Sequence, residues 1–363
     1  METVALEPFV QRHVERGTFP GVTLLAAAGG RVLFRRHFGR RALQPQPEAL
    51  DDGTLYDLAS LTKPLVTSFL VAYFIERRQW RLEDEARRYL PGLSLRASLE
   101  QLLTHSAGFR PWHPFYLYRP LEDLAQMGTL QDAAAPGRRV VYSDVGYILL
   151  RHLLEKVSGS GFCQLASEVI LTPLRLRRAF LRVPPQIRGR CAPTELGNCY
   201  EHGMCRGQHD AAAARFPWRT AVIRGEAHDA NSFYAGGSAG NAGLFATAGD
   251  LLRLGREFFP ASATLLAPET VALFWENRTP WDEEGRSIGF QLNHSPGASG
   301  GGALAPGAIG HVGITGTSLW LEAEGERQWI VLSNRVHPRV RKVNFNAVRR
   351  RLHHLLRKEL GTA

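Results

Sequence analysis

Ser60 and Lys63 lie three positions apart in the segment LASLTKP and could supply a nucleophile and its partner base. A serine hydroxyl is a poor nucleophile until a neighbouring group removes its proton. A lysine in an apolar position can have a lowered pKa and act as that base, whereas arginine keeps its proton. Only four of the 44 basic residues are lysines, so the lysine at position 63 is an uncommon choice for this chain. The same pair is also compatible with a helix-capping serine followed by a surface lysine.

A second candidate is the segment Tyr142-Ser143-Asp144, which directly precedes an apolar stretch typical of a helix. A tyrosine in this place could carry the proton of a serine if nearby cations favour its phenolate. The alternative is an aromatic residue at the end of a strand, followed by a Ser-Asp pair that caps the helix.

A third candidate is HVGITG, residues 311–316, which stands immediately before an apolar strand pattern. Glycine at position 313 lets the backbone approach a ligand closely, and the N–H of Ile314 could then point at an oxyanion. A histidine two residues before a glycine is too common to indicate a site by itself.

The elements that must position these residues follow the order strands, helices, strands, helix. That order predicts an α+β fold, in which an antiparallel sheet built from both chain ends is flanked by N- and C-terminal helices. A large, mostly helical insertion separates the two groups of strands. We expect one domain, 1–363, with an α/β lobe formed by 1–58 and 242–363 and a mainly helical lobe formed by 59–241.

The individual elements are read from hydrophobic periodicity and from turn residues. Ser60 is expected at the N-cap of a helix, with Pro64 in its first turn. The expected elements are a helix over 5–16, strands on both sides of Gly29-Gly30, helices over 60–78, 99–108 and 144–159, two strands within 317–335 joined by a Glu-Gly-Glu turn, and a final helix through Val343, Phe345, Val348, Leu352 and Leu355.

The net charge of +10 raises the question of a nucleic-acid partner. The arginines are scattered and often interleaved with acids, and the one dense basic segment is the outer face of the final helix. We therefore expect no nucleic-acid partner. No apolar run approaches the length of about 18 residues that a membrane span needs. The start, METVALEP, does not resemble a signal peptide, so we expect a cytoplasmic protein.

The four cysteines are not expected to form disulfides in that compartment. Cys199, His202, Cys205 and His209 have a ligand-like spacing but lack the paired clusters of a common zinc module. A structural metal at these residues stays an open alternative to free thiols and solvated histidines. We expect no metal in the catalytic site and no cofactor.

Taken together, the three motifs resemble those of the serine β-lactamase and penicillin-binding protein superfamily, and most closely its class C-like branch of esterases and D-Ala-D-Ala peptidases. The resemblance covers most of the chain and implies a β-lactamase/transpeptidase-like fold. The segments that carry it are TLYDLASLTKP, QLLTHSAGF (101–109), YSDVGYILL (142–150), APTE (192–195), GEAHDANSF (225–233), AGNAGLFAT (239–247) and GHVGITGTSLW (310–320).

The resemblance implies a serine hydrolase that acts through an acyl-enzyme on an ester or amide, as a carboxylesterase or as a peptidase on D-amino-acid peptides. Ser60 would be the nucleophile, Lys63 its partner and Tyr142 the general base. The N–H groups of Ser60 and Ile314 would form the oxyanion hole, with Gly313, His311 and Asp144 near the substrate.

Two residues depart from the pattern of this superfamily. The second motif usually ends in asparagine, whereas Asp144 cannot donate to a substrate carbonyl when ionised and could pair with Lys63 instead. The third motif of β-lactamases begins with lysine, whereas His311 is a weaker and pH-dependent cation. Ester or amide hydrolysis is therefore favoured over β-lactam hydrolysis, which remains an alternative.

The sequence also leaves open a different nucleophile and a non-catalytic role. Ser238 lies in a G-x-S-x-G segment, the nucleophile elbow of another hydrolase class, although no core strand is expected before it. A non-catalytic protein of the same fold could bind cell-wall fragments. The substrate, a small ester, amide or peptide, is expected to be chosen by the loops 109–140, 180–235 and 280–310. The aromatic segment 111–118 is compatible with one wall of the site and equally with packing under a loop. The oligomeric state is left open.

Overall fold

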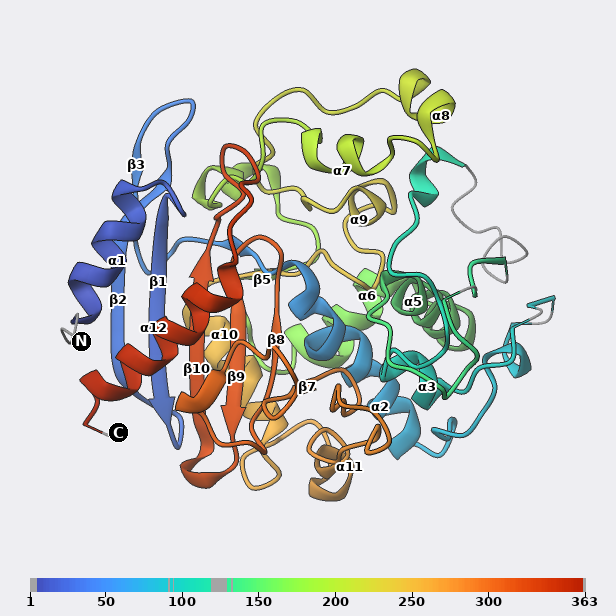
Figure 1. Ribbon diagram of the computed structural model, residues 1–363. Helices are drawn as coiled ribbons and strands as arrows, with labels where there is room; N and C mark the ends of the chain where they lie inside the picture. Colours follow the sequence, from blue (N-terminus) through green and yellow to red (C-terminus); the bar gives the residue numbers. More distant parts are fainter. Residues whose placement is uncertain (1–4, 91, 94, 119–128, 132, 362–363) are drawn as a thin grey trace.

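The fold is known from a computed structural model, which describes residues 5–90, 92–93, 95–118, 129–131 and 133–361. Its main element is a seven-stranded antiparallel sheet with the strand order β3-β2-β1-β10-β9-β8-β7. The strands come from both ends of the chain, which confirms the sheet expected from the sequence (Figure 1). Their bounds are β1 (Gly21–Ala28), β2 (Arg31–Ala42), β3 (Glu48–Ala49), β7 (Gln291–Leu292), β8 (Ile309–Val312), β9 (Ser318–Glu322) and β10 (Arg327–Ser333).

The centre of the sheet is the β1–β10 pair, in which Val22 is opposite Ser333 and Ala27 is opposite Gln328. β1 turns into β2 through Gly29 and Gly30, which have φ values of 53° and 77°. Two consecutive positive φ angles match the twist of a two-residue hairpin, and glycine adopts them without steric cost.

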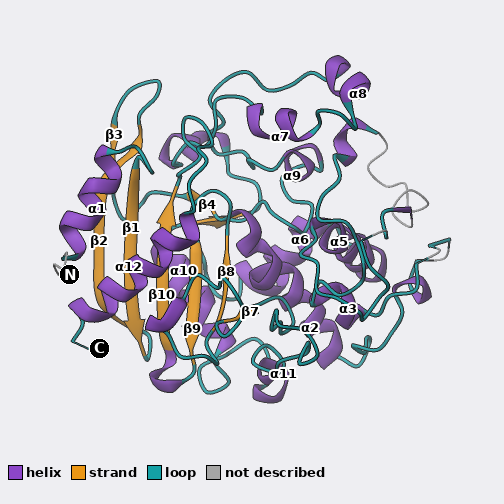
Figure 2. Cartoon of the chain, viewed as in Figure 1, coloured by secondary structure: helices purple, strands orange, loops and turns teal. Residues whose placement is uncertain are grey.

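Alternate residues of β1 face two different hydrophobic cores, as the two-residue period of a strand requires. Val22, Leu24 and Ala26 pack with α1 (Leu6–Glu15) and α12 (Phe345–Glu359) on one face. Leu25 and Ala27 belong to the larger core on the other face. Figure 2 shows α1 and α12 side by side over the sheet, as expected for the two terminal helices.

The rest of the chain is mainly helical and adjoins the second face of the sheet (Figure 1). A small antiparallel sheet with the order β4-β6-β5 lies within it. Its strands are β4 (Tyr56–Asp57), β5 (Ala179–Phe180) and β6 (Phe245–Ala246), and the helices are α2 (Phe69–Glu76), α3 (Leu99–Leu103), α5 (Asp144–Ser158), α6 (Phe162–Ala166), α7 (Cys199–Met204), α8 (Asp210–Arg215), α9 (Ala230–Tyr234), α10 (Ala248–Gly255) and α11 (Pro268–Ala272).

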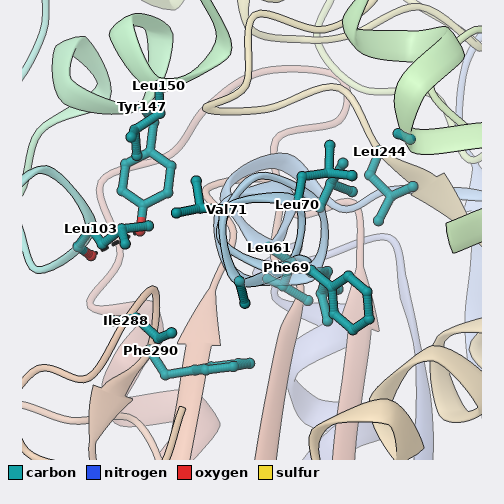
Figure 3. Close-up of a cluster of buried hydrophobic side chains, with 14 of the residues drawn as sticks. Leu61, Phe69, Leu70, Val71, Leu103, Tyr147, Leu150, Leu244, Ile288 and Phe290 are labelled. Atoms are coloured by element: carbon teal, nitrogen blue, oxygen red, sulfur yellow. Dashed lines mark hydrogen bonds between the residues drawn. The ribbon is translucent and has the colours of Figure 1, made fainter. Parts of the chain in front are cut away.

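The helix that follows Ser60 runs through the middle of the larger core. Figure 3 shows it end-on, with apolar side chains from several other segments around it. Leu61, Phe69 and Leu70 are completely buried, so the backbone that carries Ser60 and Lys63 is held by packing on all sides.

The start of that helix differs from the prediction. Residues Ala59–Leu61 form a 3₁₀ turn, Lys63–Ser68 a π-helical segment, and the regular α-helix begins only at Phe69. Ser60 is therefore inside a turn and not at an N-cap, and its side chain caps no backbone group. The π-helical segment is typical of functional sites, where it shifts side chains relative to a regular helix.

The remaining expected elements are present, two of them with shorter bounds: α3 ends at Leu103 and not at Gly108, and α12 begins at Phe345, after Val343. α3 and α5 lie where helices were predicted, and the Glu-Gly-Glu turn, Glu324–Glu326, joins β9 to β10. In the part of the chain that the structure describes, no helix is long and apolar enough to cross a membrane.

Candidate active site

The backbone before Ser60 has an uncommon conformation. Ala59 has a φ of 49°, which is rare for a residue with a Cβ and costs of the order of 1 kcal/mol or more. The carboxylate of Asp57 holds this turn, because its Oδ1 accepts the N–H of Ala59 at 2.8 Å. Its other oxygen, Oδ2, accepts the N–H of His228 at 2.8 Å. Such strain is found where the surrounding structure fixes a reactive side chain.

Lys63 is completely buried and makes three hydrogen bonds. Its Nζ donates to Ser60 Oγ at 3.2 Å, to Asp144 Oδ1 at 2.6 Å and to the carbonyl oxygen of Asn241 at 3.0 Å. An ammonium group has three N–H donors, so this arrangement uses all of them.

The charge of Lys63 differs from the sequence-based expectation. Burial by itself would lower the pKa of Lys63, but the Asp144 carboxylate and Tyr142 more than offset that effect, and the pKa is raised above its ordinary value. This shift favours an ammonium beside Ser60 over the neutral amine that was expected from the sequence to remove the serine proton. The expected pairing of Asp144 with Lys63 is present.

Tyr142 is surrounded by aromatic rings and cations. Its ring centroid lies 4.4 Å from that of His105 and 5.8 Å from that of His311. Lys63 Nζ lies 4.9 Å from the ring centroid, and the Arg286 guanidinium carbon lies 5.6 Å from it. Both cations therefore lie within the distance at which a cation is attracted to an aromatic ring.

The two histidines beside Tyr142 are neutral. Burial first, and then the charges of Arg286 and Lys63, hold the pKa of His105 and of His311 well below the ordinary value. His311 Nδ1 lies 3.0 Å from the carbonyl oxygen of Val312, to which it can donate. The description of His311 as a pH-dependent cation was therefore wrong, because burial beside two cations keeps the ring uncharged.

The segment after β8 approaches the Ser60 turn closely. A Cβ on Gly313 would collide with the side chain of Thr317 and lie 2.6 Å from the carbonyl oxygen of Leu58, so only glycine fits there. Thr315 Oγ1 donates to the carbonyl oxygen of Asp57 at 2.7 Å, which ties the two segments together. Within the described residues the N–H of Ile314 has no hydrogen-bond partner, as an oxyanion donor requires.

Ser60 opens into a cavity of about 310 Å³. The first two predicted loops supply part of its wall, whereas the loop 280–310 supplies Arg286, which lies over the Tyr142 ring, and none of the lining residues. Of the aromatic segment 111–118, Trp112 lines the cavity, while Phe115 and Tyr116 are buried in packing. The lining residues are Ala59, Ser60, Pro111, Trp112, Tyr142, Asp144, Tyr200, Glu201, Met204, His228, Asp229, Asn241, Ala242 and Ile314.

Sequence reasoning missed a buried network behind this wall. His228 Nε2 lies 3.2 Å from Glu195 Oε2, and both side chains are almost completely buried. Burial would lower the pKa of His228, but the Glu195 and Glu201 carboxylates raise it above the ordinary value. Through its N–H, His228 also reaches Asp57 at the nucleophile turn. The signal was present in the segments APTE and GEAHDANSF, which carry Glu195 and His228.

Ser238 does not have the setting of a nucleophile. It follows the short helix α9, its side chain is buried, and its Oγ donates to the carbonyl oxygen of Ala242 at 2.5 Å. It does not line the cavity. A nucleophile elbow needs a strand before the serine and a helix after it, so the structure contradicts that hypothesis.

The four residues with ligand-like spacing make separate contacts. The thiol of Cys199 faces the carbonyl oxygen of Leu196, and the His202 ring lies against Trp218. Cys205 is near Tyr116, and His209 is near Tyr118. Among the residues described here, no group of three or more His, Cys, Asp or Glu side chains is arranged to hold a metal ion.

Comparison with known proteins agrees with this architecture. The family model described as beta-lactamase matches residues 6–352. A putative D-alanyl-D-alanine carboxypeptidase of Escherichia coli K12 is 28% identical, over 92% of this chain and 82% of the relative.

Two solved structures show the same fold at low sequence identity. A class C beta lactamase has a TM-score of 0.73 and 15% identity, with 97% of this chain and 96% of the other covered. EstCE1, a hydrolase with promiscuous acyltransferase activity, has a TM-score of 0.70 and 18% identity, with 96% and 97% covered. The predicted family and fold are thereby confirmed: the chain belongs to the beta-lactamase family and is a serine hydrolase of the β-lactamase-related class.

Proposed function

We propose that this protein hydrolyses an ester or amide in two steps, through an acyl-enzyme on Ser60. The observation that carries the proposal is the position of Ser60 Oγ, 3.2 Å from a buried lysine ammonium at the wall of the cavity. Ile314 lines the same cavity, and its N–H, which has no partner among the described residues, is available as a donor for the oxyanion.

The charge of Lys63 decides how the proton moves. Against the lowering effect of burial, the Asp144 carboxylate, 2.6 Å from Lys63 Nζ, and Tyr142 raise the pKa of Lys63, and a protonated Lys63 has no lone pair to accept the proton of Ser60. We therefore assign the base to Tyr142, while Lys63 and Arg286 stabilise its negative charge.

The reaction then follows from these positions. Ser60 Oγ attacks the substrate carbonyl carbon as its proton passes to Tyr142, and the oxyanion accepts the N–H groups of Ser60 and Ile314. Tyr142 returns the proton to the leaving alcohol or amine, which leaves an acyl-enzyme. Water then attacks the acyl carbon while Tyr142 takes its proton. Tyr142 returns that proton to Ser60 Oγ as the acid is released.

The substrate class that we propose is a carboxylic ester or a peptide with D-amino acids. The name of the Escherichia coli relative, a putative D-alanyl-D-alanine carboxypeptidase, supports the peptide. β-Lactam hydrolysis is less well supported, since the neutral His311 provides no charge for the carboxylate of the antibiotic.

The test compares p-nitrophenyl esters of increasing chain length, nitrocefin and a D-Ala-D-Ala peptide. We expect ester or peptide turnover in the native protein, none in Ser60→Ala and at least about a hundredfold less in Tyr142→Phe. Ser238→Ala is the matched control and is expected to keep full activity. Activity that survives Ser60→Ala would contradict the proposal.

A further inference from the structure

Two carboxyl groups in the wall of the cavity, Asp229 and Glu201, have no cationic partner. Asp144 is neutralised by Lys63 at 2.6 Å, and Glu195 pairs with His228 at 3.2 Å. Among the described residues, by contrast, neither Asp229 nor Glu201 forms an ion pair. Acidic groups that remain unpaired in a cavity favour a ligand that brings the missing positive charge.

Glu201 is the more unusual of the two. The residue is almost completely buried, with an exposed fraction of only 4%. One oxygen, Oε1, accepts the N–H of Ala230 at 2.9 Å, and the Tyr116 hydroxyl lies near the carboxyl, but no group within the described residues donates to Oε2 with ordinary hydrogen-bond geometry. A buried carboxyl oxygen without a donor is costly unless a ligand supplies one.

The basic groups near the two acids are engaged elsewhere. His228 is paired with Glu195, and Lys63 is paired with Asp144. Arg219 lies close enough to influence Glu201 and Asp229, but its guanidinium donates elsewhere. Its Nε donates to Asn198 Oδ1, and its two terminal nitrogens donate to the carbonyl oxygens of Ala227 and His228. The arginine therefore holds the loop in place and forms no ion pair with either carboxyl.

The rest of the wall suits an organic cation. Trp112 and Tyr200 line the same cavity, and an ammonium group is attracted to the face of an aromatic ring. Met204 adds an apolar surface for the carbon chain of the ligand.

We propose that the substrate carries a protonated primary amine, which binds between Asp229 and Glu201 while Ser60 attacks the carbonyl group. This rests on the proposed function and narrows the substrate to an amine-bearing ester or amide. Tyr142 transfers the proton beside the Lys63 ammonium, and the two acids select the substrate.

The ionisation of Glu201 is also expected to change when the amine binds. Burial, and then the charge of Asp229, raise the pKa of Glu201 to about 8, so the empty site holds a proton at neutral pH. A bound ammonium favours the carboxylate, so binding should release that proton. The titratable and charged groups that face Glu201 are Asp229, His228, Tyr116, Cys205 and Arg219.

The experiment measures binding in the full-length Ser60→Ala protein, so that no turnover is needed. Three matched pairs of amides differ only in an ammonium replaced by a methyl group: alaninamide and isobutyramide, β-alaninamide and butyramide, and 6-aminohexanamide and heptanamide. In at least one pair we expect the amine to bind about tenfold more tightly or better, the scale of a charged hydrogen bond. Calorimetry in buffers of different ionisation enthalpy measures the released proton.

Glu201→Gln and Asp229→Asn test the two carboxyls with little change of shape. Glutamine at position 201 still has an oxygen that can accept the N–H of Ala230. Asparagine at position 229 still has an oxygen that can accept the N–H of Ser232, which lies 2.7 Å from Asp229 Oδ1 in the native protein. Both changes should remove most of the preference for the amine, and Glu201→Gln should also abolish proton release. Asp210→Asn, in the exposed first turn of α8, is the charge-matched control and should change neither.

Equal binding within every pair would overturn the inference, and so would a preference that survives both substitutions. Neither outcome affects the hydrolase proposal, because that proposal depends on the chemistry of Ser60. Conversely, a protein that shows no Ser60-dependent activity but still prefers the amines would refute only the hydrolase.

Discussion

Replacing Asp144 by asparagine removes the negative charge 2.6 Å from the buried Lys63 ammonium. The Lys63 side chain has no exposure and that of Asp144 has 19%, so the pair is largely shielded from water. Removing one partner of a buried ion pair costs about 3–5 kcal/mol. We take about 3 kcal/mol, because the asparagine oxygen still accepts one N–H.

This loss of unfolding free energy can be measured as a decrease in the melting temperature, Tm. Unfolding entropy is about 2.1 cal/mol/K per residue, which gives about 0.76 kcal/mol/K for 363 residues. A loss of about 3 kcal/mol therefore lowers Tm by about 4 °C. The control is Asp52→Asn, which removes an exposed acid 3.2 Å from Arg35 and should lower Tm by about 1 °C or less.

The same variant separates the two possible roles of Lys63. Without Asp144, burial lowers the pKa of Lys63, and the ammonium is lost at a lower pH. If Lys63 works as a cation, kcat/KM of Asp144→Asn falls earlier than that of the native protein as the pH rises from about 6 to about 10. A Tm equal to that of the control, or activity that rises instead with pH, would refute our reasoning.

Three further predictions address single positions. Lys63→Arg keeps the charge but cannot reproduce three convergent N–H bonds in a completely buried site, so kcat/KM should fall by at least about a hundredfold, and near-normal turnover would contradict this. Gly313→Ala pushes the backbone that carries the Ile314 N–H and should lower kcat about a hundredfold or more, whereas Gly302→Ala, where a Cβ meets no atom within 4 Å, is the control and should change little. Glu201→Gln tests the raised pKa of Glu201 by its effect on stability. Between pH 4.5 and about 8 the folded protein keeps a proton on Glu201 that the unfolded chain has released. The stability of the native protein therefore falls as the pH rises through that range. The glutamine variant should lack this fall in thermal unfolding measured across pH, and an identical pH dependence in both proteins would show that Glu201 is already ionised.

The sequence was a good guide wherever local patterns decide the structure. The apolar runs on both sides of Gly29-Gly30 predicted two strands, and the motifs around Ser60 and Tyr142 predicted residues that the structure brings into one cavity. These features depend on backbone periodicity and on short segments, which are visible in a single chain.

The ionisation states could not be predicted, because they depend on contacts between distant segments. Lys63 is charged because Asp144, 81 residues away, contributes its carboxylate to the pair. His311 is neutral because it is buried beside Arg286 and Lys63. The hydrogen bond between Asp57 and His228 joins residues that are 171 positions apart, so no local sequence pattern could predict it.

The central claim is that Ser60 forms the acyl-enzyme, and mass spectrometry of the trapped intermediate tests it most directly. The native protein is treated with a fluorophosphonate or with a slowly released ester, digested and mapped. Our account predicts one adduct on the peptide that contains Ser60, absent from Ser60→Ala and unchanged in Ser238→Ala. An adduct on another serine, or no adduct while the ester is still hydrolysed, would contradict the account.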